Sequence, residues 1–165
     1  PIDVHLMVHE PEAILESLVK LGANIIDIHI EACSDPSRLV SLVHTMGAQI
    51  GIAINPATGI EKVNSLLPKV DRVLVMSVHP GFPAQEFLPS ALPKLQATYN
   101  SNLAHSYNLD IAVDGGISPK TSSSVAKAGA RTLIAGSSVF TSSLSIEDAI
   151  ASIRQLAQQG IEEAL

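Results

Sequence analysis

Short apolar segments recur along the chain and are separated by longer amphipathic stretches. Each segment has the length and the β-branched content of a buried strand. Four of the five intervals between their first residues are about 22 to 25 residues, the spacing that strand–helix alternation produces. This alternation predicts right-handed βαβ units and a parallel sheet. The six predicted strands are Ile2–Val8, Asn24–Glu31, Gln49–Asn55, Arg72–Val78, Asp110–Asp114 and Thr132–Ala135.

The stretches between these strands have the periodicity of amphipathic helices. Pro11–Leu21 and Asp35–Met46 both place aliphatic residues three and four positions apart, on one helical face. Asp35 precedes a proline, which is a common way for a helix to begin. The long interval before the fifth strand contains a further predicted helix around Ser90–Tyr107, and the serines at 122–124 lie inside another.

Two parallel architectures fit this alternation, and the loops favour one of them. A doubly wound sheet usually has a glycine-rich turn after its first strand, and residues 8–11 contain no glycine. Asp114–Ile117 and Ala135–Ser138 are small glycine-containing turns after the last two strands, where a TIM barrel binds phosphate. We therefore predict one α/β domain over residues 1–165, an incomplete TIM (β/α)8 barrel with about six βα units, strands 3 to 8. The abrupt start at Pro1 suggests that the first two units are missing.

The composition supports a buried core and excludes some partners. Charged residues make up 16% of the chain, below the roughly 25% of an average domain, and hydrophobic residues 46%. The net charge of −6 argues against nucleic acid or an anionic membrane as a partner. No apolar run approaches the roughly 18 residues of a membrane span. Cys33 is the only cysteine, so no internal disulfide forms, and we expect a reducing, cytoplasmic location.

Strand alternation places a set of polar and sulfur side chains at one mouth of the predicted barrel. Side chains of one parity point inward, and the aliphatic residues of the other parity suit packing under helices. Each member of the set also has a plainer interpretation, since a histidine can be a hydrogen-bonded core residue and a methionine a core filler. Asn55 could simply end a strand, and Asp114 could belong to an ordinary turn. The inward set is His5, Met7, His29, Glu31, Asn55, Met76 and Asp114.

The positions of the lysines exclude one class of barrel enzyme. An aldolase that works through a Schiff base needs a lysine inside the barrel, and so do phosphosugar decarboxylases that use a strand lysine. Catalysis is therefore left to carboxylate, imidazole and metal. All six lysines fall in predicted helices or loops: Lys20, Lys62, Lys69, Lys94, Lys120 and Lys127.

Several short motifs together resemble one family, the ribulose-phosphate 3-epimerases, in their order and spacing. The resemblance extends through Phe140, and Ser145–Leu165 then corresponds to the closing helix. It implies the interconversion of D-ribulose 5-phosphate and D-xylulose 5-phosphate. The motifs are Asp3–Val8, His29–Ala32, Asn55–Thr58, Val75–Val78, Pro80–Phe82, Val113–Ile117 and Ala135–Ser137.

The resemblance also implies a metal-dependent mechanism. Members of this family hold one divalent metal ion (Zn, Mn, Fe or Co) with two histidines and two aspartates. His5 and Asp114 match two of these ligands, and Asp114 also matches one of the two acid/base residues. The positions of the other two ligands precede Pro1. We therefore expect the 165-residue polypeptide by itself to be inactive, and the full-length protein to form a homo-oligomer.

The substrate-binding residues follow from the same resemblance. Methionines line the family's site, a loop covers the substrate, and two glycine turns hold the phosphate. The loop departs from the family pattern, because Pro83 and Ala84 replace two glycines. Two alternatives stay open: a hexulose-phosphate 3-epimerase, such as one for allulose 6-phosphate, and a non-catalytic remnant. The implied substrate-binding residues are His5, Met7, Met76, Gly81, Phe82, Pro83, Ala84, Asp114, Gly115, Gly116, Gly136 and Ser137.

Overall fold

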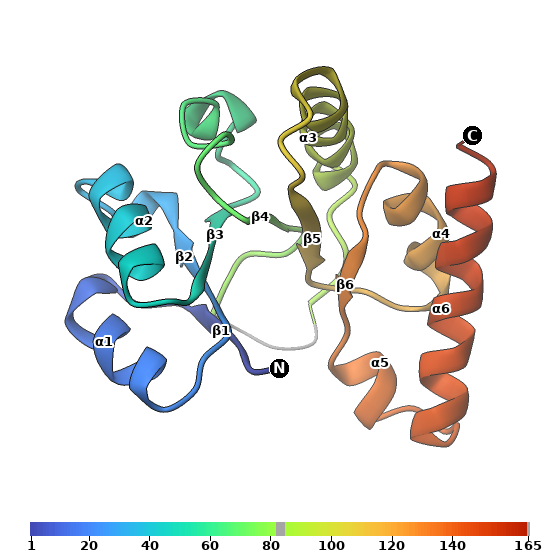
Figure 1. The fold of residues 1–165 in the computed structure, drawn as a ribbon. Coiled ribbons are helices and arrows are strands. Elements are labelled where there is room, and N and C mark those ends of the chain that lie inside the picture. The colour runs from blue at the N-terminus through green and yellow to red at the C-terminus, as the bar shows by residue number, and fades with distance from the viewer. Residues whose placement is uncertain (82–84, 165) are drawn as a thin grey trace.

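The computed structural model describes residues 1–81 and 85–164. Six strands alternate with helices along the chain (Figure 1). In the described residues, no helix is both long enough and apolar enough to cross a membrane. The elements are β1 (Asp3–Leu6), α1 (Glu12–Lys20), β2 (Ile25–His29), η1 (Ile30–Ala32), α2 (Pro36–Thr45), β3 (Gln49–Ile54), η2 (Ile60–Val63), β4 (Arg72–Met76), α3 (Ala91–His105), β5 (Asp110–Asp114), α4 (Pro119–Lys127), β6 (Thr132–Ile134), α5 (Ser137–Phe140) and α6 (Ile146–Glu162).

The strands form a single sheet in the order β1-β2-β3-β4-β5-β6, and every neighbouring pair is parallel. The sheet curves, with the helices along its outer side and with β1 and β6 at its two edges (Figure 1). Helices on both faces would have indicated a doubly wound sheet. The prediction of an incomplete α/β barrel with six βα units is therefore confirmed.

The predicted elements occur where the sequence placed them, with ends that differ by a few residues. Helix α2 begins after Asp35, whose carboxylate accepts a hydrogen bond from the backbone N–H of Arg38 at 3.1 Å. Helix α6 begins after Ser145, whose hydroxyl accepts from the Asp148 N–H at 3.0 Å. Strand β1 is shorter than predicted, and Ile2 and Met7 beside it are about half exposed. In the described residues β1 pairs only with β2, so its ends have no second strand to continue the ladder.

Strand alternation sorts the side chains into two layers. The aliphatic residues of one parity, such as Ile26, Ile52 and Val75, belong to the large core between the sheet and the helices. The other parity makes a smaller inner cluster, against which the partly buried Ile134 packs; its buried members are Ala53, Leu74, Met76, Val78 and Ala112. Polar side chains of the same parity lie along the strands before and after this inner cluster. The polar groups of the strands therefore face the inside of the barrel.

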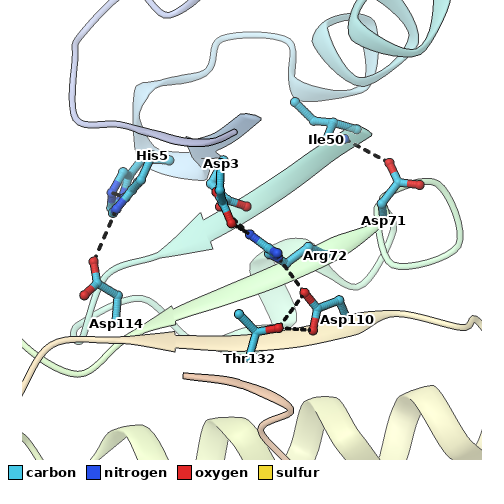
Figure 2. Close-up of polar contacts among 10 residues, drawn as sticks. Asp3, His5, Ile50, Asp71, Arg72, Asp110, Asp114 and Thr132 are labelled. Atoms are coloured by element: carbon cyan, nitrogen blue, oxygen red, sulfur yellow. Dashed lines mark hydrogen bonds and ion pairs between the residues drawn. The ribbon is translucent and has the colours of Figure 1, made fainter. Parts of the chain in front are cut away.

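Near the N-terminal end of the sheet, Arg72 forms ion pairs with Asp3, Asp27 and Asp110, of which Figure 2 labels Asp3 and Asp110. Its Nη1 donates to Asp3 and, at 3.1 Å, to Asp27, and its Nε donates to Asp110 at 2.8 Å. Asp27 is fully buried, and burial raises the pKa of its carboxyl to about 6 against the opposing attraction of Arg72. The sequence did not predict this network, because only inward residues toward the C-terminal ends of the strands were considered as candidate site residues.

Candidate active site

The C-terminal ends of β1 and β5 bring His5 and Asp114 together. His5 Nδ1 lies 3.4 Å from Asp114 Oδ2, although 109 positions separate the two residues in the chain. Both side chains remain accessible, with 12% of the His5 side chain and 26% of the Asp114 side chain exposed. Figure 2 shows this pair closer than the Arg72 network to the C-terminal ends of the strands, where the arrows point. The arrangement places an imidazole and a carboxylate at the barrel end where enzymes of this architecture carry out their chemistry.

A second histidine lies behind His5. His29 Nε2 is 2.8 Å from His5 Nε2, and the two rings stack at an angle of 24°. On its other side, His29 Nδ1 is 3.3 Å from Glu31 Oε2. Burial, followed by the nearby His5, lowers the pKa of His29 below its ordinary value. The sequence placed His29 and Glu31 on the inward parity but did not predict their contact with His5.

Glu31 is held by donors from the segment after β3. Its Oε1 accepts the backbone N–H of Asn55 at 2.9 Å and the hydroxyl of Thr58. Burial by itself would raise the pKa of the Glu31 carboxyl, but these hydrogen bonds outweigh it and lower the pKa. The ammonium of Lys94 fixes the same segment, donating to the carbonyls of Asn55 and Pro56 at 2.8 and 2.7 Å. Asp114, His5, His29 and Glu31 therefore form a continuous polar chain across β5, β1 and the end of β2.

A cavity of about 370 Å³ opens beside this chain, within the size range of small-ligand sites. Asp114 is the only acidic residue among the described residues that line it. Of the residues predicted to bind substrate, eight line this cavity. They are Met7, Met76, Gly81, Asp114, Gly115, Gly116, Gly136 and Ser137. Phe82, Pro83 and Ala84, which were also predicted to bind substrate, lie outside the described residues.

The turn after β5 needs glycine at two successive positions. Gly115 and Gly116 have φ angles of +115° and +62°, in the left-handed region. A Cβ on Gly116 would also lie 2.6 Å from the backbone nitrogen of Phe87, so the loop before α3 packs directly against this turn. The close approach explains why this wall of the cavity consists of backbone.

We expect Gly116→Ala to destabilise the protein by about 1–3 kcal/mol, because it combines a left-handed φ with a backbone clash. Urea unfolding would measure the change. Gly136→Ala is the matched control, since Gly136 has a negative φ of −103° and no atom within 4 Å of an added Cβ. Equal unfolding midpoints for the two variants would contradict the prediction.

The side chains at this position are of the types that bind divalent metal ions, but the described residues supply only part of a metal site. Imidazole and carboxylate donors bind zinc and similar ions, and His5 and Asp114 converge at 3.4 Å. In the described part of the chain, no three His, Cys, Asp or Glu side chains gather closely enough to hold a metal. Among the described residues, His5 and Asp114 therefore supply two converging donors.

Comparison with known proteins places the chain in one family. The family model described as "Ribulose-phosphate 3 epimerase family" matches residues 1–140. Ribulose-phosphate 3-epimerase of Bacillus subtilis is 38% identical over 141 residues, which cover 85% of this chain and 65% of that protein. The Candida glabrata protein of the same name is 41% identical over 141 residues, covering 86% and 56%. The chain thus spans less than two thirds of the length of these relatives.

Solved structures support the fold alone. KGPDC from Streptococcus mutans aligns with a TM-score of 0.70 at 11% identity, covering 97% of this chain and 73% of that chain. The 3-hexulose-6-phosphate synthase from Salmonella typhimurium aligns with a TM-score of 0.61 at 18% identity, covering 88% and 67%. Because none of the six strands described here contains a lysine, a strand lysine is not available for chemistry in this sheet.

Proposed function

The chain belongs to the ribulose-phosphate 3-epimerase family, and from that premise we propose that it forms most of an enzyme interconverting D-ribulose 5-phosphate and D-xylulose 5-phosphate. The observation that carries this proposal is the His5–Asp114 pair, in which Asp114 lines a cavity that two glycine-containing turns also line. The pair supplies acid/base chemistry, and the turns supply backbone N–H groups for a phosphate.

In this reaction Asp114 is the proton carrier on one face of the substrate. Epimerisation beside a ketone removes the proton at C3 and returns one to the opposite face, through an ene-diolate. The Asp114 carboxylate is partly exposed to the cavity, so it can accept a proton from a bound sugar. The second acid/base group has to come from outside the described residues that line the cavity.

We assign His5 and Asp114 as two ligands of a divalent metal ion, which is Zn, Mn, Fe or Co. Such an ion, when bound, would stabilise the negative charge that develops on the substrate oxygens. His5 approaches the site from β1 and Asp114 from β5, so the two ligands come from opposite parts of the curved sheet. Met7 and Met76 contribute apolar side chains to the lining of the cavity.

The phosphate would bind at the turns after β5 and β6. Gly115 and Gly116 follow β5, and Gly136 and Ser137 follow β6, and all four line the same cavity. Backbone N–H groups can hold an anion without a cluster of lysines or arginines. The relatives reported above are named for ribulose phosphate, which favours the pentose phosphate over a hexulose phosphate as the substrate.

The proposal is tested by following the C3 proton. The full-length protein that contains this chain would be loaded with a divalent metal and incubated with D-ribulose 5-phosphate in D₂O. We expect xylulose 5-phosphate to form with deuterium at C3, detected by NMR. Allulose 6-phosphate serves as the comparison substrate, and faster exchange on it would assign the enzyme to hexulose phosphates instead. Absence of exchange on both sugars would reject the proposal.

His5→Ala is expected to lower metal content as well as turnover, because the imidazole is a direct ligand in this proposal. Metal stoichiometry after gel filtration would be compared between the variant and the wild-type protein. His44→Ala is a suitable control, since His44 lies on α2 and contacts Asp71 rather than the cavity. If His5→Ala kept full metal occupancy, His5 would not be a ligand.

A further inference from the structure

We propose that Ser77 is a positioning residue, whose hydroxyl orients the glycine turn after β5 so that this turn can hold a phosphate. Ser77 follows β4 directly and is not among the described residues that line the cavity. It lies in the segment Val75–Val78, whose resemblance to the family assigned it no role. The inference deepens the proposed function, and it rests on that function in one respect, the assignment of this turn to the phosphate.

The hydroxyl of Ser77 is buried against the backbone of the turn. Ser77 is 0% exposed, and its Oγ lies 2.6 Å from the carbonyl oxygen of Gly115 and 2.9 Å from that of Asp114. A serine hydroxyl has only one proton to donate. The Asp114 carbonyl already accepts the backbone N–H of Ser77 at 2.8 Å, whereas within the described part of the chain the Gly115 carbonyl has no other donor. We therefore assign the hydroxyl proton to Gly115.

This hydrogen bond fixes the peptide between Gly115 and Gly116. In a planar trans peptide, the C=O and N–H groups point in opposite directions. Because the Gly115 carbonyl points at the buried hydroxyl, the Gly116 N–H points away from Ser77. Gly116 lines the cavity, and among the described residues no group accepts a hydrogen bond from its N–H. A backbone N–H of this kind is a donor for an anion.

The glycines make the turn depend on this hydrogen bond. Gly115 and Gly116 have φ angles of +115° and +62°, and glycine has more backbone conformations open to it than any other residue. The backbone of Phe87 packs against Gly116, but it does not set the direction of the Gly115 carbonyl. The Ser77 hydroxyl therefore supplies a constraint that the residues of the turn do not supply themselves.

Removing the hydroxyl should leave the rest of the site in place. In Ser77→Ala, the backbone N–H of residue 77 still donates to the Asp114 carbonyl, and its own carbonyl still accepts the Leu88 N–H at 2.8 Å. The position of Asp114 is therefore retained, whereas the Gly116 N–H loses its fixed direction. This predicts weaker binding of the phosphate group with little change in the chemical step.

The substitution is tested by separating binding from turnover in the zinc-loaded, full-length protein. We expect Ser77→Ala to raise both KM for D-ribulose 5-phosphate and the dissociation constant of inorganic phosphate about 10-fold, as for the loss of one hydrogen bond to a charged group. kcat should change less than KM, which is the signature of lost binding. Steady-state kinetics and calorimetric titration with phosphate measure these constants. A lower kcat with unchanged KM and unchanged phosphate affinity would overturn the proposal.

The wild-type protein provides a test that needs no variant. In ¹⁵N-glycine spectra, the amide of Gly116 should shift as inorganic phosphate is added, because its N–H is the donor that Ser77 orients. In Ser77→Ala the same shift should require more phosphate. A Gly116 amide that does not respond to phosphate in the wild-type protein would overturn the assigned role of the turn and of Ser77 with it.

Ser122→Ala is the matched control. Ser122 is also 0% exposed, and its hydroxyl donates to a backbone carbonyl, that of Ser118, at 2.6 Å on α4. Loss of this hydroxyl should affect stability without raising KM. Equal increases in KM in Ser77→Ala and Ser122→Ala would show a general effect of losing a buried hydroxyl, and would contradict the positioning role.

Ser77→Thr tests whether the hydroxyl itself is responsible, because threonine keeps that group. Its phosphate affinity should be close to that of the wild-type protein. If Ser77→Thr unfolded at the wild-type urea concentration but bound phosphate as weakly as Ser77→Ala, the hydroxyl would not be the cause.

Failure of this inference and failure of the proposed function give different results. Phosphate affinity and the Gly116 amide are measured without turnover. If phosphate bound as expected and Ser77→Ala weakened it, but no C3 exchange occurred, the proposed function would fail and the role of Ser77 would stand. If C3 exchange occurred and Ser77→Ala bound phosphate as tightly as the wild-type protein, the function would stand and the positioning role would fail.

Discussion

Asp114→Asn is expected to reduce epimerisation by at least 10²- to 10⁴-fold, the usual contribution of one general acid/base group, while the fold is retained. Asparagine has nearly the same shape as aspartate, but it cannot accept and return a proton. The change also weakens one metal bond, which adds to the loss. Exchange of the C3 proton with solvent, measured in the full-length protein, reports the chemical step directly.

Asp110→Asn is the matched control for this substitution. Asp110 lies on the same strand and the same inward parity, but at the N-terminal end, where it contacts Arg72 and Thr132 instead of the cavity. We expect the control to change stability more than exchange. Normal exchange in Asp114→Asn with full metal occupancy would reject the catalytic assignment and leave Asp114 as a turn residue.

The architecture could be predicted from the sequence because its two signals are local. Strand and helix periodicities are set by neighbouring residues, and the regular spacing of the strands determines a parallel sheet once they alternate with helices. The ends of the strands could not be predicted as well, because they depend on pairing. The sequence predicts one strand over Ile2–Val8, yet only Asp3–Leu6 pairs with β2.

The members of the site could be predicted from strand parity and motif resemblance, but their mutual contacts could not. His5, His29 and Asp114 all have inward parity, which places them inside the barrel without specifying distances. The 2.8 Å contact of the two histidines follows from the register of β1 against β2, in which His5 lies opposite Asp27. Periodicity does not encode register, so the polar chain from Glu31 to Asp114 emerges only in three dimensions.

The Arg72 network shows a second limit of the sequence. Asp27 and Arg72 occur in strands that are otherwise strongly apolar, and each is a charged residue at an inward position. That combination is a detectable signal, because a charge inside a core needs a partner of opposite sign. Asp27 and Arg72 lie opposite Gly51 in the register, and a Cβ on Gly51 would lie 1.7 Å from Asp27 Oδ1. Gly51 therefore provides the space in which the two charges meet.

Arg72→Met is expected to destabilise the fold by about 3–5 kcal/mol, because it leaves a buried charge without its partner. Asp27 is fully buried and cannot turn to water, whereas the side chains of Asp3 and Asp110 are 38% and 32% exposed. Methionine fills much of the volume of arginine, so lost packing contributes little. Urea unfolding at pH 7 would measure the loss.

The double variant Arg72→Met/Asp27→Asn separates the buried charge from other causes. If the unpaired carboxylate is what destabilises Arg72→Met, removing its charge should recover most of the lost stability.

The pH dependence gives a second check, since the pKa of Asp27 is raised to about 6 in the folded protein and its unfolded value is near 3.8. A raised carboxyl pKa means that the folded state holds the proton more tightly, so stability falls as pH rises through this range. Loss of Arg72 removes an interaction that lowers this pKa, so the destabilisation of Arg72→Met should shrink when the pH is lowered from 7 to 5. Two results together would contradict this explanation: a double variant as unstable as Arg72→Met, and a loss of unfolding free energy in Arg72→Met that does not change with pH. They would show that Arg72 stabilises the sheet by packing and not by neutralising Asp27.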